Sequence, residues 1–157
     1  MEILIVNPIT LENVPLQEWK QSENPQSAEL IVIKTEDKEL YLSKRILPER
    51  YKFDEAQKAA AEFCPVRKPS QLGDFRNPTR KEAIDIYDAR FAGLDEAIEL
   101  LGGDSISGRW YWTSESDPDP EYSSRSAFIY YGDNGGLDNY GKYIAGTVRP
   151  VSAFLNR

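Results

Sequence analysis

Hydrophobic and polar positions along this chain fall into blocks, and the period of each block predicts its local structure. Runs rich in branched and aromatic residues, which are typical of strands, occupy residues 2–6, 28–34 and 39–46. The polar residues 35–38 separate the last two runs, so these runs are expected to form a β-hairpin. Prolines and polar residues dominate positions 8–27, which indicates a loop with a helical turn near residues 16–20.

Two later segments have a helical period. In residues 53–63 the small or apolar positions recur on one face, at Ala56, Ala59, Ala60 and Phe63. A second helix is expected to begin at Thr79, because Thr79 and Glu82 match a capping box. Its predicted buried side comprises Ala83, Ile84, Ile86, Tyr87 and Phe91. We expect Gly93 to interrupt this helix, residues 94–101 to resume it and Gly102-Gly103 to end it.

Aromatic strands joined by long polar turns follow Gly103. This part holds Trp110, Trp112 and six of the nine tyrosines. Strands are predicted for residues 109–114, 126–131 and 147–154, and residues 139–145 form either a strand or an ordered loop. Alternation places Trp110 and Trp112 on one face of their strand and Tyr111 on the other. Pro150 is expected at a bulge or at an unpaired edge position. Together these elements predict an α+β fold.

Length and charge limit the class of protein. The 157 residues suit one domain, residues 1–157, with a core that needs neither disulfides nor metal. A formal net charge of -7 argues against nucleic acid or an anionic membrane as the main partner. Without a signal peptide or a long apolar run, we predict a cytoplasmic protein with no membrane partner. The single cysteine, Cys64, lies in an apolar stretch and is expected to be buried.

The absence of histidine narrows the available chemistry. It excludes Ser-His-Asp and Cys-His nucleophiles and His-ligated metals. Carboxylate or tyrosine catalysis and an oxygen-ligated calcium or magnesium site remain open. The loop acids Asp117, Asp119 and Glu121 lack EF-hand spacing. The acids of the second helical region have the spacing of solvated helix faces; they are Asp85, Asp88, Asp95, Glu96 and Glu99. We therefore predict a non-catalytic protein with no cofactor and no metal site.

Five short motifs, in order and at matching distances, resemble the DUF1566 family, also called the Legionella collagen-like protein C-terminal domain. They are Phe53-Asp54-Glu55-Ala56, Asn77-Pro78-Thr79-Arg80-Lys81-Glu82, Tyr111-Trp112-Thr113-Ser114, Ala127-Phe128-Ile129-Tyr130-Tyr131-Gly132 and Val148-Arg149-Pro150-Val151. The resemblance covers residues 47–154 and leaves residues 1–46 as an N-terminal part made of strands and a hairpin. Family members commonly carry Trp-Arg-Leu-Pro where this chain has Phe75-Arg76-Asn77-Pro78.

The resemblance implies a C-type-lectin-like fold: two helices packed on a twisted antiparallel sheet, with the first and last strands paired. It also implies a displayed loop surface rather than catalysis. Similar patterns occur in bacterial and phage ligand-binding proteins, including adhesins. Formylglycine-generating enzymes share this fold family, but they depend on active-site cysteines near the C-terminal end, where this chain has none.

A ligand-binding surface is predicted where rigid aromatics accompany short polar groups on Gly-containing loops. Its residues are Tyr122, Tyr131, Asp133, Asn134, Asp138, Asn139, Tyr140 and Lys142. Such a surface suits a protein ligand, or a carbohydrate held by stacking and hydrogen bonds. The alternative is that Gly, Asn and Asp serve turn geometry while the tyrosines cover the sheet. Two other hypotheses stay open: an accessory subunit, for example a virion component or homo-oligomer assembled through residues 1–46, and an enzyme using carboxylates or tyrosine.

Overall fold

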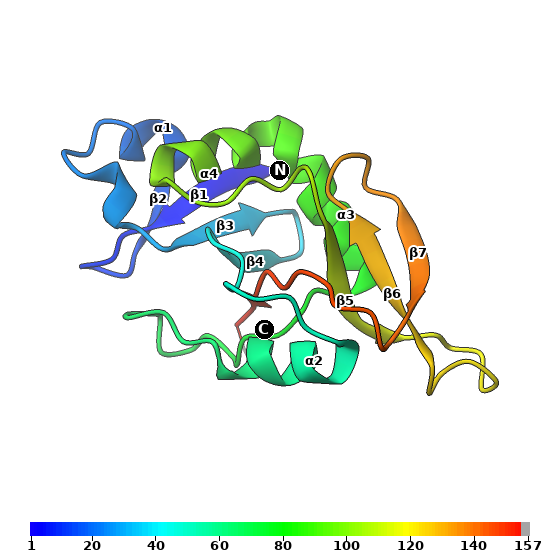
Figure 1. The fold of residues 1–157 in the computed structure, drawn as a ribbon. Helices are drawn as coiled ribbons and strands as arrows, with labels where there is room; N and C mark the ends of the chain where they lie inside the picture. The colour runs from blue at the N-terminus through cyan, green and yellow to red at the C-terminus, as the bar shows by residue number, and fades with distance from the viewer. Residues whose placement is uncertain (155–157) are drawn as a thin grey trace.

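Two antiparallel sheets and the helices around them make up the α+β fold of the computed structural model, which describes residues 1–154 (Figure 1). The larger sheet has the order β2-β1-β3-β4-β8, with bounds Asn13–Pro15, Glu2–Val6, Leu30–Lys34, Glu39–Ser43 and Val151–Ser152. The smaller sheet has the order β5-β6-β7, with bounds Trp110–Ser116, Ser126–Tyr131 and Leu137–Gly141. The helices are α1 (Leu16–Trp19), η1 (Pro25–Ser27), α2 (Phe53–Glu62), α3 (Arg80–Ala89), η2 (Arg90–Leu94) and α4 (Asp95–Leu101).

The larger sheet is buried on both faces, which explains why its central strands are almost continuously apolar. Alternate residues such as Ile3 and Ile31 pack in one core cluster with residues of α3 and α4. The intervening residues, such as Leu4 and Val32, pack on the opposite side with Phe75. Figure 1 shows α4 lying along one side of β1, and α2 at the opposite end of the molecule, beside the smaller sheet. The predicted hairpin of β3 and β4 is confirmed by their antiparallel pairing.

The smaller sheet separates its aromatic residues by face, as the alternation predicts. Trp112 packs edge-on to Phe53 of α2, with the two ring centroids 5.3 Å apart. On the other face, Tyr111 stacks on Tyr130 at 4.8 Å, and both tyrosines join the cluster that contains α3. Close approach of α2 is allowed by the alanines of its buried side, among them Ala56. Thus α2 and α3 cover opposite faces of the smaller sheet.

The predicted signals at both ends of the second helical region are confirmed. The Thr79 hydroxyl accepts a hydrogen bond from the Glu82 amide, and the Glu82 carboxylate accepts one from the Thr79 amide. Gly93 interrupts the region with φ of 122°, a conformation that glycine adopts without strain. A Cβ at this position would also lie 3.3 Å from Leu16 Cδ2. Gly102 ends α4 in the left-handed conformation.

Two predicted buried positions of this helical region are exposed instead. Ile84 and Phe91 expose 46% and 74% of their surface. The side of α3 that faces the core is narrower than the prediction, and its alanines, such as Ala83 and Ala89, bring the helix close to its neighbours. The prediction for Cys64 is also wrong: α2 ends at Glu62, and Cys64 lies exposed on the segment that follows.

The strand pairing differs from the one that the resemblance implies. Strands β3 and β4 lie between β1 and β8, so the first and last strands of the described chain do not pair. Strand β8 is short and pairs with β4, while Pro150 immediately before it accepts a hydrogen bond from the Ser43 amide. Strand β7 begins at Leu137, earlier than predicted, and β2 was not predicted. The end of the predicted domain, residues 155–157, lies outside the described residues.

The N-terminal part shares its core with the rest of the chain. One apolar cluster combines Ile3, Ile31 and Leu42 with Ile98 of α4 and with Val151 of β8. Removing residues 1–46 would therefore take away β1, β3 and β4 and expose the apolar side chains that pack on them. A truncation at that point cannot serve as a test of assembly, because the remaining chain loses most of its larger sheet.

Candidate functional site

Four of the eight predicted ligand-binding residues come together on one face of the β6–β7 hairpin. Asp138 and Tyr140 alternate along β7, so their side chains project to the same side. Lys142 lies in the turn directly after β7, with its ammonium group over the ring of Phe53. Tyr131 joins them from β6, where its amide donates a hydrogen bond to the Gly136 carbonyl. We call Tyr131, Asp138, Tyr140 and Lys142 the β7 strip.

Hydrogen bonds connect three members of the β7 strip. The Tyr131 hydroxyl lies 3.3 Å from Asp138 Oδ2 and within hydrogen-bonding distance of the Tyr140 hydroxyl. The hydrogen bond to Tyr140 and the loss of solvent around the phenol raise the pKa of Tyr131 to about 12, and the nearby Asp138 charge adds to this effect. The Tyr131 phenol is therefore a neutral hydrogen-bonding group beside a carboxylate at neutral pH.

The β7 strip rests on a rigid aromatic base. Tyr140 packs edge-on to Trp110 at 4.7 Å, and Trp110 packs in the same way on Trp112 at 5.4 Å. The indole nitrogen of Trp112 donates to the Tyr51 carbonyl, which fixes the buried ring. The ammonium group of Lys142 lies 4.8 Å from the ring centroid of Phe53. Packing thus orients the Tyr140 ring, and the Phe53 ring places the Lys142 ammonium, before any ligand binds.

The other four predicted residues do not join the strip. Asp133 accepts a hydrogen bond from the Gly108 amide, and Asn134 accepts one from the Gly136 amide. These contacts favour the turn interpretation for both residues. The Asn139 side chain donates to Asp117 Oδ2, away from the strip, and Tyr122 lies in the β5–β6 loop with the Arg125 guanidinium over its ring.

Strand β7 forms the outer edge of the smaller sheet, yet part of its backbone is occupied. The Asn139 amide donates to Asp138 Oδ1, and the Gly141 carbonyl accepts from the Ile144 amide. Groups that are satisfied locally are poor partners for an added strand. Recognition at this edge would therefore depend on side chains more than on strand addition.

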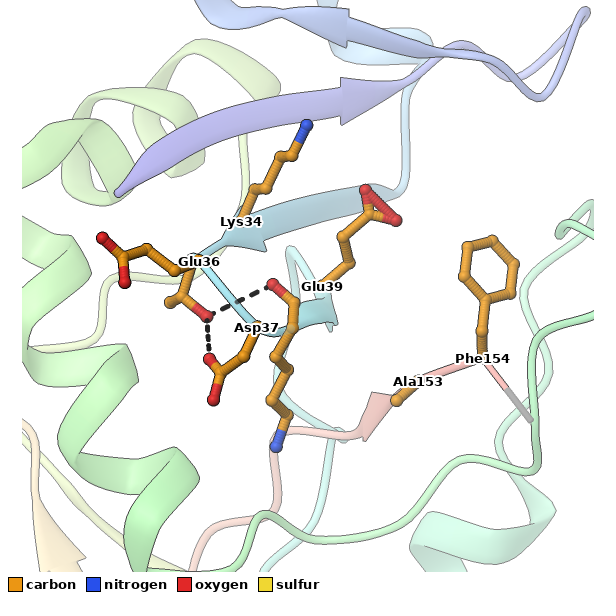
Figure 2. Close-up of a pocket in the computed structure, with 8 residues that line it drawn as sticks. Lys34, Glu36, Asp37, Glu39, Ala153 and Phe154 are labelled. Atoms are coloured by element: carbon orange, nitrogen blue, oxygen red, sulfur yellow. Dashed lines mark hydrogen bonds between the residues drawn. The ribbon is translucent and has the colours of Figure 1, made fainter. Parts of the chain in front are cut away.

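A cavity of about 440 Å³ lies at the tip of the β3–β4 hairpin, next to Ala153 and Phe154 (Figure 2). Figure 2 shows the side chains of the cross-strand partners Lys34 and Glu39 pointing to the same side of the hairpin, and that of Glu36 pointing away from them. The Thr35 hydroxyl bonds to the Asp37 carboxylate within the hairpin turn. Because its charged groups have mixed sign and do not converge, this cavity is a weaker candidate than the β7 strip.

Glu82 forms a buried charge cluster that the sequence did not reveal. Its carboxylate accepts two hydrogen bonds from Arg76, one from Lys38 and one from the Thr79 amide. Burial opposes its ionisation, but the hydrogen bonds from Arg76 and Lys38 prevail and lower the pKa of Glu82 to about 2. Every donor around Glu82 comes from the protein itself, so we assign this cluster to structure.

Arg149 is a second residue whose role sequence reasoning missed. Its guanidinium is fully buried and donates to the carbonyls of Ser43, Lys44, Asp104 and Ser105. The sequence does carry one signal of this role: Arg149 lies in the otherwise apolar run around Val148 and Val151. An arginine in such a run is expected to be buried with hydrogen-bonding partners, because arginine is rarely buried without them. It ties the end of β4 to the loop after α4.

Neither a metal-ion cluster nor a membrane-spanning helix occurs among the described residues. Within residues 1–154, no group of three or more His, Cys, Asp or Glu side chains is arranged to hold a metal ion. None of the described helices is long and apolar enough to cross a membrane.

A scan against protein-family models and a comparison with curated proteins both found no match. The resemblance to the DUF1566 family therefore stays a prediction.

Proposed function

We propose that this protein is a non-catalytic binding domain that recognises a protein or glycan ligand through the β7 strip. One observation carries the proposal: a carboxylate, two phenols and an ammonium group share one partly exposed face above a fixed aromatic base. Rigid aromatics beside adaptable polar groups are the composition of recognition surfaces. A C-type-lectin-like scaffold, as the sequence resemblance implies, is consistent with this role.

The chemistry of the β7 strip limits what it can bind. Asp138 accepts hydrogen bonds, the phenols of Tyr131 and Tyr140 donate and accept them, and Lys142 donates. A ligand rich in hydroxyl or amide groups can pair with these atoms while an apolar face rests on the rings. The two candidate classes, protein and glycan, both meet this description.

A binding screen with matched variants tests the proposal. The purified chain is screened on a glycan array and against a displayed peptide library, with calcium and with chelator. Against any ligand found, Asp138→Asn with Tyr140→Phe is expected to weaken binding at least about tenfold, since it removes a charge and a hydroxyl. These substitutions keep side-chain shape, so the packing of Tyr140 on Trp110 is retained.

The β5–β6 loop offers a control of the same chemistry. Asp119→Asn with Tyr122→Phe also exchanges one carboxylate and one phenol, but outside the β7 strip. Unchanged binding in this control, together with loss in the strip variant, supports the assignment. Equal losses in the two double variants, or a wild-type chain that binds nothing in either buffer, would contradict it.

A further inference from the structure

Helix α3 carries a row of large apolar side chains that the core does not use. Ile84, Tyr87 and Phe91 follow one another at helical spacing from α3 into η2. Phe91 is largely exposed, and Ile84 exposes nearly half of its surface. The Tyr87 ring lies directly against the β6–β7 turn, where a Cβ added to Gly135 would be 2.5 Å from Tyr87 Cγ. Tyr87 also packs edge-on to Phe91 at 5.4 Å. We call Ile84, Tyr87 and Phe91 the α3 row.

A cavity of about 430 Å³ lies at the C-terminal end of the α3 row. Phe91 lines it together with Met1, Ile3, Leu16 and Gly93. Its volume is in the range of natural ligand pockets and is ample for one large apolar side chain. Phe91 belongs to both features, so the row continues into the cavity. The polar side chains Glu2, Gln17 and Glu96 also line the cavity.

Two aspartates lie beside the α3 row, while the guanidinium of Arg90, which pairs with Asp95, lies over the Phe91 ring. Asp85 and Asp88 follow Ile84 and Tyr87 on the helix, and neither forms an ion pair with another described residue. Lys38 and Lys81 lie within electrostatic range of Asp85 and offset part of its charge. Asp88 is exposed. The chain as a whole has a formal net charge of -7, which favours a cationic partner further.

We propose that the α3 row and its cavity bind a cationic amphipathic segment of a partner protein. Apolar residues of the segment cover the row, one of them enters the cavity, and its Lys or Arg residues pair with Asp85 and Asp88. From Ile84 to Phe91 the row spans about 10 Å, which corresponds to roughly two turns of a partner helix. Since α3 packs on the face of the smaller sheet opposite the β7 strip, this site is separate from the proposed ligand surface.

Fluorescence anisotropy with a designed peptide tests this inference. The probe is a labelled helical peptide of about twelve residues with leucines on one face and lysines elsewhere, compared with a scrambled peptide of the same composition. We expect saturable binding of the probe and at least about tenfold weaker binding of the scrambled peptide. Ile84→Gln with Phe91→Ser, and separately Asp85→Asn with Asp88→Asn, are each expected to weaken binding of the probe at least about fivefold.

The controls separate this site from general attraction to an acidic protein. Ile9→Ser with Val66→Ser removes apolar side chains that are 75% and 88% exposed elsewhere, and it is expected to leave probe binding unchanged. Asp117→Asn with Asp119→Asn removes two negative charges from the β5–β6 loop, as many as the Asp85 and Asp88 variant removes from α3. This variant should also leave probe binding unchanged. Far-ultraviolet circular dichroism checks that each variant is folded. Absence of saturable binding up to about 1 mM probe, or equal affinity in folded α3 and control variants, would overturn the proposal.

Discussion

Replacing Arg149 with methionine is expected to lower the free energy of unfolding by about 3 to 5 kcal/mol. The guanidinium donates to four carbonyls that belong to the end of β4 and the loop after α4. Methionine fills much of the volume but donates no hydrogen bond. Of these acceptors, Lys44 O keeps the Asp104 amide as a donor, and Ser105 O keeps Arg109 and the Tyr111 hydroxyl.

The expected loss is smaller than the sum of four charged hydrogen bonds. Among the described residues, no carboxylate lies within ion-pair distance of Arg149, so removing its charge also relieves a cost of burial. Urea unfolding followed by tryptophan fluorescence measures the difference. Arg109→Met is the control, because Arg109 is less buried and donates to one of the same carbonyls, Ser105 O. A loss below about 1 kcal/mol in the Arg149 variant would contradict the assigned role.

Replacing Glu82 with glutamine is expected to lower the free energy of unfolding by about 3 kcal/mol at pH 7. The variant keeps the shape of the side chain but leaves Arg76 and Lys38 without their shared carboxylate. It also weakens the capping box at Thr79. Glu115→Gln is the matched control. Glu115 is partly exposed and pairs with Arg80, so its replacement should cost less than about 1 kcal/mol.

The effect of Glu82 is expected to depend on pH in one direction. Its pKa falls from 4.5 in the unfolded chain to about 2 in the folded protein, so its contribution is fully present above pH 4.5. Protonation removes the contribution as the pH falls through this interval towards 2. The stability curves of the wild type and Glu82→Gln should therefore converge between about pH 5 and pH 2. Parallel curves over that interval would show that the Glu82 charge does not stabilise the fold.

Local sequence signals predicted the local structure of this protein well. The Thr79–Glu82 capping box, the break at Gly93 and the alternation of Trp110, Tyr111 and Trp112 are all confirmed. Each depends on residues a few positions apart, whose geometry the backbone fixes. The exposure of individual side chains was harder to predict. Helical spacing places Ile84 on the same side of α3 as its apolar neighbours, but it does not show how much of that side the sheet covers.

Contacts between distant residues were not predictable from the sequence. Glu82 meets Lys38 from a hairpin 44 residues earlier, and Arg149 meets Ser43 across 106 residues. No periodic pattern reports such pairs. The candidate site shows the same limit, because alternation brings Asp138 and Tyr140 to one face, whereas the loop contact of Asn139 with Asp117 depends on how two separate turns meet.

The pairing of β4 with β8 has a consequence for biosynthesis. The larger sheet receives β8 from the far end of the described chain, and Arg149 supplies the bonds that close the neighbouring loops. Strands β1, β3 and β4 leave the ribosome before β8, with apolar side chains on both faces and the β4 edge still unpaired. Such segments are prone to associate with other chains. The nascent protein must therefore keep β1, β3 and β4 apart from other chains until β8 emerges and pairs with β4.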